Sequence, residues 1–210
     1  MGADKLLLPL DGSPILQHVI HAATASRLRP LVLVMNRDNP DLARRINPGR
    51  CRVVRVAEGG YSASLQAGLT AAAAAGDIAG AMFILGDQPL VRTATMERLI
   101  TAFAAEPHRW VAPVFRGQRG NPVITPAAWF QSIFALRGDT GPRRHLTDPD
   151  AQLKPVRVED EGVVFDIDSP EDYARLTGVR LHDTPGNRPG RAAANRDSSG
   201  YGWSSRRHRR

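Results

Sequence analysis

The fold class follows from Ala81-Met82-Phe83-Ile84-Leu85-Gly86-Asp87-Gln88-Pro89-Leu90. Its first five residues are all apolar, which predicts a short strand buried on both faces. The strand ends in Gly86 and a single carboxylate, Asp87, before Gln88 and Pro89 form a turn. Ligands of an open parallel sheet bind beyond the carboxyl ends of its strands. The stretch therefore predicts a buried parallel strand with a candidate site directly after it.

Strands and helices alternate on both sides of this stretch. The pattern predicts further strands at 6–10, 31–35, 52–56, 110–115, 156–158 and 163–167, and helices at 15–25, 40–46, 62–75, 93–105, 126–136 and 170–176. Such alternation indicates βαβ units around one sheet. We expect an α/β, Rossmann-like three-layer sandwich with a mostly parallel sheet.

Charge and composition change near residue 179. Residues 180–210 contain eight arginines and two aspartates, so they carry six of the seven net positive charges, and 1–179 carry one. This tail is rich in Gly, Pro, Ser and Asn and has almost no aliphatic periodicity, which predicts disorder. We expect one domain over 1–179 and a disordered basic tail over 180–210. A nucleic-acid contact through the tail is an alternative that the near-neutral body disfavours.

Cysteine usage and hydropathy indicate the compartment. The single cysteine, Cys51, excludes an intramolecular disulfide framework. The sequence shows no run of 18 apolar residues and no secretory signal. We expect a cytoplasmic protein without a membrane contact.

Two acidic motifs are candidates for cation binding. Asp87 after its strand suits Mg²⁺, which takes one or two carboxylates and completes its shell with water and substrate phosphates. Asp166 and Asp168 are two residues apart and would share one face of a strand, where like charges repel unless a cation or donors lie between them. Ser169 is then predicted to cap the helix that follows.

Three polar segments are candidates for substrate contacts. Lys5, one of only two lysines against 26 arginines, suits a phosphate as a compact point charge. Gly59-Gly60-Tyr61-Ser62-Ala63-Ser64 enters a helix whose free N–H groups can bind an anion or a base edge, the alternative being simple capping by Ser62. Arg119-Gly120-Asn121-Pro122 is a loop whose Asn could contact a base or ribose, or serve only as a turn.

Together and in this order, these segments resemble the molybdenum cofactor cytidylyltransferases, which are MobA-like members of the GT-A-like nucleotidyltransferases. The resemblance covers residues 1 to about 177, and its matching pieces are Met1-Gly2, Lys5–Leu10, Ser62–Leu65, Gly68-Leu69, Gly86–Pro89, Arg119–Val123, Gly138–Arg143 and Asp166–Tyr173. Guanylyl-transferring relatives tend to have Asn where this chain has Asp166 and Asp168, so the resemblance favours the cytidylyl group.

The resemblance implies an enzyme that transfers CMP from CTP to the terminal phosphate of molybdopterin-bound molybdenum and releases pyrophosphate. It implies Mg²⁺ as cofactor, CTP and the molybdopterin cofactor as ligands, and a recipient molybdoenzyme or chaperone as a further partner. The roles it implies are catalytic for Lys5 and Asp87, metal-binding for Asp87 and Asp168, and ligand-binding for Ser62, Ser64, Gly86, Gln88, Asn121 and Asp139. Ser62 and Ser64 would face the base or ribose, and Asn121 and Asp139 the pterin.

The start of the chain departs from the family pattern. In the family a central strand and a Gly-rich loop precede the lysine, whereas this sequence begins at the Met of that motif, so we expect the first strand to be missing. Either the start codon lies upstream, or the protein is a truncated, weak or inactive relative. A nucleotidyltransferase for another NTP or a sugar-phosphate acceptor, and a non-catalytic cofactor- or nucleotide-binding protein, remain alternative functions.

Overall fold

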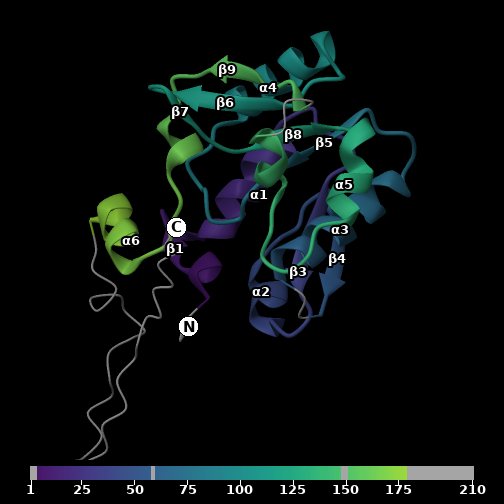
Figure 1. Cartoon of the computed structure of the whole chain (residues 1–210). Helices are drawn as coiled ribbons and strands as arrows, with labels where there is room; N and C mark the ends of the chain where they lie inside the picture. The colour runs from purple at the N-terminus through teal and green to yellow at the C-terminus, as the bar shows by residue number, and fades with distance from the viewer. Residues whose placement is uncertain (1–3, 58–59, 148–150, 179–210) are drawn as a thin grey trace, which may run out of the picture.

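The computed structural model describes residues 4–57, 60–147 and 151–178, so the predicted tail lies outside the described residues. Figure 1 shows its elements. The helices are α1 (Ile15–Ala25), α2 (Pro40–Arg45), α3 (Gly60–Ala73), α4 (Thr93–Ala105), α5 (Phe130–Phe134) and α6 (Pro170–Thr177), with short 3₁₀ turns η1 (Lys5–Leu7), η2 (Ala127–Trp129), η3 (Pro142–Thr147) and η5 (Glu161–Val164). The strands are β1 (Pro9–Leu10), β2 (Ser13–Pro14), β3 (Val32–Asn36), β4 (Arg52–Val56), β5 (Gly80–Phe83), β6 (Val111–Phe115), β7 (Gln118–Arg119), β8 (Val123–Pro126) and β9 (Lys154–Arg157).

The α/β fold class is confirmed, and the central sheet is mixed rather than mostly parallel. β3 pairs with β4 and β6 with β9 in parallel, whereas β8 runs antiparallel to both β5 and β6. The reason lies between β6 and β8, where residues 116–122 make only a tight hairpin through β7. A parallel return would need a crossover of a dozen or more residues.

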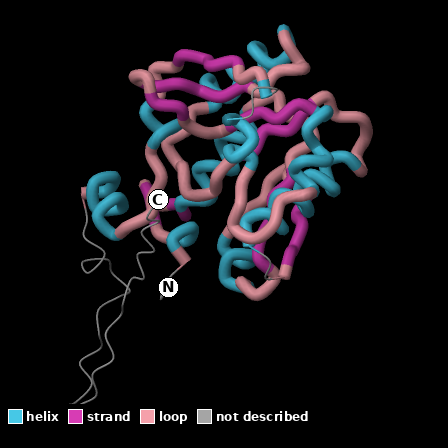
Figure 2. The backbone as a smooth tube through the Cα atoms, viewed as in Figure 1, coloured by secondary structure: helices cyan, strands magenta, loops and turns pink. Residues whose placement is uncertain are grey.

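The strands form separate paired groups. β3 and β4 make a two-stranded sheet, and β5, β8, β6 and β7 make a second sheet in that order, with β9 on β6. Figure 2 shows these groups, the β6–β9 pair at the top and the β3–β4 pair at the lower right. Among the described strands, β3 and β5 are each paired along one edge only.

Helices α1, α4 and α6 begin at the predicted residues, and of these three only α6 has a side-chain cap. α6 begins at a capping box, in which the Ser169 hydroxyl accepts from the Asp172 N–H and the Asp172 carboxylate accepts from the Ser169 N–H. The predicted helices 15–25 and 93–105 coincide with α1 and α4. α4 packs its Met96 and Leu99 side chains into the core with no exposed surface, and burial of such a side chain stabilises the fold by about 1.5–3 kcal/mol.

Three predicted elements are wrong in kind. Residues 163–167 are not a strand, because η5 occupies 161–164 and an irregular extended segment follows. The predicted helix 126–136 is split, because Pro126 closes β8 and a 3₁₀ turn precedes the short α5. Residues 6–10 hold η1 and two strand residues, because Asp4 caps a 3₁₀ turn by accepting from the Leu6 N–H at 2.9 Å.

Within the described ranges, no helix is long and apolar enough to cross a membrane.

Candidate active site

The fold brings Lys5, Asp87 and Asp168 together from three distant parts of the chain. The Lys5 ammonium lies 2.6 Å from Asp87 Oδ2 and 2.9 Å from Asp168 Oδ1. The side chains of Lys5 and Asp87 are about four-fifths buried, with exposures of 20% and 19%, whereas Asp168 is 66% exposed. The cluster is therefore buried at Lys5 and Asp87 and open to solvent at Asp168.

Backbone contacts fix the three side chains beside one another. Lys5 begins the η1 turn that Asp4 caps, and Asp87 follows β5. The Ile167 N–H donates to the Asp87 carbonyl at 3.2 Å, which joins the segment of Asp168 to the end of β5. The site thus sits beyond the carboxyl end of β5, and α/β sheets bind their ligands beyond the carboxyl ends of their strands.

The charges of this cluster shift one another's protonation. Burial alone lowers the pKa of Lys5, but the hydrogen bonds to Asp87 and Asp168 outweigh it and raise the pKa above its ordinary value. The hydrogen bond from Lys5 lowers the pKa of Asp168. Partial burial, followed by the negative charges of Asp168 and Asp87, raises the pKa of Asp166. Lys5 pairs with two carboxylates, Asp87 and Asp168, and Asp166 interacts with both of them, so the cluster has more acidic than basic groups and favours a second cation.

The donor set fits a divalent metal that shares its shell with a substrate. Asp87 and Asp168 each place an oxygen within 2.9 Å of one cationic nitrogen, so a single small cation can be approached by both. Across the described residues, no group of three or more His, Cys, Asp and Glu side chains is arranged to hold a metal alone. Mg²⁺ commonly takes one or two carboxylates and completes its shell with water and phosphate oxygens.

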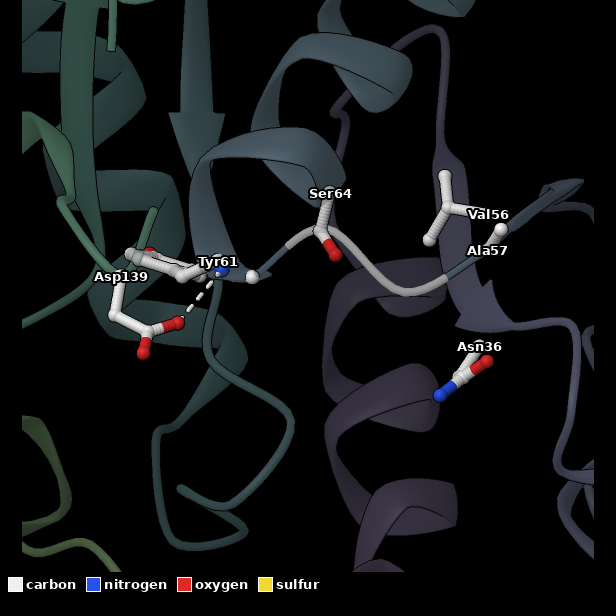
Figure 3. Close-up of a pocket in the computed structure, with 7 residues that line it drawn as sticks. Asn36, Val56, Ala57, Tyr61, Ser64 and Asp139 are labelled. Atoms are coloured by element: carbon white, nitrogen blue, oxygen red, sulfur yellow. Dashed lines mark hydrogen bonds between the residues drawn. The ribbon is translucent and has the colours of Figure 1, made fainter. Parts of the chain in front are cut away.

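A pocket of about 600 Å³ opens at the ends of β3, β4 and α3. Figure 3 shows Asn36 at the end of β3 on one side and the Tyr61 and Asp139 side chains on the other, with Ser64 between them. Its lining residues are Asn36, Val56, Ala57, Gly60, Tyr61, Ser64 and Asp139. The mixture of amide, hydroxyl, carboxylate and aromatic groups suits a polar ligand with a planar ring.

The start of α3 is closed by the loop that carries Asp139. The Tyr61 N–H donates to Asp139 Oδ1 at 3.2 Å, and the Ser62 N–H donates to the Gly138 carbonyl at 3.0 Å. These are two of the four N–H groups that a helix leaves free at its start. Gly60 has a φ of +72°, and a Cβ there would lie 2.8 Å from Asp139 Oδ1. This close approach requires glycine.

The structure distinguishes the two predicted serines. Ser64 lines the pocket, whereas Ser62 is buried with 3% of its surface exposed. The predicted N-cap role of Ser62 is wrong, because α3 already begins at Gly60 and Ser62 lies inside its first turn. A ligand contact by Ser64 stays a prediction.

The remaining predicted residues lie at different depths around the cluster. Gly86 borders a second, apolar cavity, where a Cβ would lie 3.2 Å from Leu16 Cδ1. Gln88 is buried and lines neither cavity. Asn121 is also buried, and its N–H donates to the Val163 carbonyl at 2.8 Å. The binding roles of these three residues stay predictions.

Sequence reasoning missed Asn36 as a pocket residue. It ends β3 and lines the pocket, and its Oδ1 accepts from the Asp38 N–H at 2.9 Å. The available signal was its position, a polar residue directly after an apolar strand. Tyr61 was quoted within the glycine and serine motif but given no role of its own.

The sheet, the helices that cover it and the acidic cluster at the end of β5 define an α/β nucleotidyltransferase fold. Residues 1–157 match the MobA-like NTP transferase domain, and the chain belongs to this family, as the sequence motifs predicted. Residues 158–178, which include Asp168, lie beyond the matched range.

Known proteins agree with this assignment. The chain is 28% identical over 183 residues to the purine catabolism protein PucB of Bacillus subtilis strain 168, a match that covers 82% of this chain and 87% of PucB. The structure of Rv0371c from Mycobacterium tuberculosis H37Rv in complex with manganese superposes with a TM-score of 0.70 at 23% identity, covering 83% of this chain and 91% of that one. A cytidylyltransferase from Leptospira borgpetersenii superposes with a TM-score of 0.66 at 15% identity, covering 82% and 77%.

Proposed function

We propose that this protein transfers CMP from CTP to the terminal phosphate of a molybdopterin cofactor and releases pyrophosphate. An oxygen of the acceptor phosphate attacks the α-phosphorus of CTP, and the bond to the β-phosphate bridging oxygen breaks. The attacking oxygen is already ionised, so no general base is required. Catalysis of this kind rests on positioning and charge neutralisation.

The observation that carries the proposal is the joint contact of Lys5 with Asp87 and Asp168 at the end of β5. Asp87 and Asp168 would hold Mg²⁺, which when bound supplies positive charge to the triphosphate and the leaving pyrophosphate. Lys5 would turn from the carboxylates to the phosphate oxygens as a point charge. Manganese in the related Rv0371c structure supports a divalent metal in this fold.

The choice of base and acceptor has separate support. Asp166 and Asp168 match the cytidylyl pattern of the resembling family, and a cytidylyltransferase is among the structural neighbours. The pocket places the amide of Asn36 and the hydroxyl of Ser64 where they could meet a ring and its sugar. Asn121 and Asp139 would lie towards the pterin.

The test is pyrophosphate release with Mg²⁺, molybdopterin cofactor and each of CTP, GTP, ATP and UTP. We expect CTP to give the fastest release and Asp87→Asn to slow it by roughly 10²-fold or more, because a preorganised charge is removed. Asp77→Asn is the matched control, since Asp77 is an exposed carboxylate beyond the far end of α3. Equal rates with all four nucleotides, or full activity in Asp87→Asn, would overturn the proposal.

A further inference from the structure

Lys5 enters the candidate active site from η1, a turn of only three residues. Such a turn holds itself weakly, because the hydrogen bonds of a 3₁₀ turn have poorer geometry than those of an α-helix. The Leu7 N–H donates to the Asp4 carbonyl at 2.9 Å, and Asp4 Oδ1 accepts from the Leu6 N–H at 2.9 Å. The placement of the Asp4 side chain therefore helps to set the conformation of the turn that carries Lys5.

The second oxygen of the Asp4 carboxylate is held by the residue that caps α2. Asp4 Oδ2 accepts a hydrogen bond from the side-chain amide of Asn39. The Asn39 Oδ1 in turn accepts from the Leu42 N–H at 3.0 Å and so caps α2. The contact between Asp4 and Asn39 is partly buried, where a hydrogen bond is stronger than at an open surface. One side chain thus joins the start of α2 to the start of η1.

Other contacts make α2 a support for the end of η1. Leu7 is buried in a core cluster with Leu42 of α2 and Ile46, which follows that helix. The Arg45 guanidinium donates to the Leu7 carbonyl at 3.4 Å. These contacts hold the last residue of η1, whereas Asn39 acts through Asp4 on its first residue, Lys5.

Asn39 also lies on the loop that carries a pocket residue. This loop joins β3 to α2 and begins with Asn36, which lines the pocket. The Asn39 N–H donates to the Asn36 carbonyl at 3.4 Å. Hydrogen bonds therefore connect the pocket residue, the cap of α2 and the turn of Lys5 in one short series.

We propose that Asn39 is a positioning residue of the candidate active site. Through Asp4 it holds η1 so that the Lys5 ammonium stays between the two carboxylates of the site. The proposal rests on the proposed function for the use of Lys5 at the nucleotide phosphates, whereas the positioning itself concerns the protein alone. Without the Asn39 amide, the Asp4 carboxylate loses a donor and η1 gains freedom. A misplacement of about 1 Å at a catalytic group can slow a reaction by roughly 10²-fold.

An exchange of the two side chains tests this role. Asn39→Asp removes the amide donor and sets two carboxylates against each other, while the new carboxylate can still cap α2. Adding Asp4→Asn to this variant restores one donor and one acceptor with their places exchanged, so the double variant should recover the position of Lys5. Asn47→Asp is the matched control, because it makes the same change at an exposed residue beyond the other end of α2.

Nitrogen-15 labelling of lysine reads the position of Lys5 directly, since the chain contains only two lysines. An ammonium held by strong, charge-assisted hydrogen bonds exchanges its protons slowly and gives a sharp N–H signal. Lys154 donates to Glu106 and is the internal reference, and the spectrum of Lys5→Arg assigns the two signals. We expect Asn39→Asp to broaden the Lys5 signal alone, the double variant to restore it, and Asn47→Asp to change neither signal.

Pyrophosphate release with CTP, Mg²⁺ and molybdopterin cofactor is the second measurement. Asn39→Asp should slow it by up to roughly 10²-fold, and the double variant should recover the rate. An unchanged Lys5 signal in Asn39→Asp, equal broadening of both lysine signals, or a double variant as impaired as the single one would overturn the positioning role. If the wild type releases no pyrophosphate, the proposed function fails, and the lysine signals still decide the role of Asn39.

Discussion

Replacement of Asp160 by alanine should destabilise the fold strongly, because this buried carboxylate joins α4 to η5. Only 2% of Asp160 is exposed. Its Oδ2 accepts from the Arg92 N–H at 3.0 Å and from the Thr95 hydroxyl at 2.6 Å, and its Oδ1 accepts from the Gly162 N–H at 3.1 Å. Hydrogen bonds to a charged group contribute about 1.5–3 kcal/mol each, and they are not additive.

We expect Asp160→Ala to lower the free energy of unfolding by about 3–5 kcal/mol, as for other broken buried charge networks. Urea unfolding followed by circular dichroism measures this change. The melting temperature should fall by roughly 6–20 °C, given about 2–4 °C per kcal/mol for a domain of this size. Glu159→Ala is the matched control, because Glu159 is exposed and its substitution should stay within about 0.5 kcal/mol. A loss below about 1 kcal/mol in Asp160→Ala would refute the reasoning.

Two further predictions each concern the replacement of one residue. Gly120→Ala should lower the free energy of unfolding by about 1–3 kcal/mol or more, because a Cβ there would lie 2.1 Å from the Val163 carbonyl oxygen. Urea unfolding measures this change, and a variant as stable as the wild type would contradict the prediction. Glu106→Gln should destabilise the protein at pH 7 but not near pH 2, because hydrogen bonds first from Lys154 and then from Arg109 lower the pKa of Glu106 from 4.5 to about 2. A carboxyl pKa that is lowered by folding stabilises the protein above pH 4.5, and this stabilisation is lost as the pH falls towards 2. Thermal melts of both proteins between pH 2 and pH 7 measure the effect. A difference in melting temperature between wild type and Glu106→Gln that stays constant with pH would contradict the interpretation.

Apolar runs and capping residues were sufficient to predict much of the fold. The strand over 52–56 and the helix over 93–105 coincide with β4 and α4, because continuous apolar or helix-periodic residues have few alternatives. β8 was missed, since Val123–Pro126 has only four residues and ends in a proline that is typical of a loop. The antiparallel course of β8 depends on the hairpin at residues 116–122, which no periodicity reveals.

The charged residues of the candidate site could be predicted from the sequence, whereas the directions of its polar side chains could be predicted less well. Lys5, Asp87 and Asp168 were chosen from motifs, and the fold brings them within hydrogen-bond distance. Ser62 and Ser64 point in different directions from α3, because they are two residues apart on a helix. The helix was predicted to begin at residue 62 but begins at Gly60, so the sequence did not show which of the two serines faces the pocket. The contact of Asp139 with α3 joins residues 78 positions apart, and a local pattern carries no signal for it.

The proposed function requires that Asp87 belong to a site that binds CTP with a divalent metal. Thermal unfolding of the protein with Mg²⁺ and each NTP in turn tests this requirement. A ligand at a hundredfold its dissociation constant adds about 2.7 kcal/mol, which corresponds to roughly 5–11 °C for a domain of this size. We expect the largest shift with CTP, retained in Asp77→Asn and lost in Asp87→Ala. An equal shift in Asp87→Ala, or no shift with any nucleotide, would contradict the proposed function.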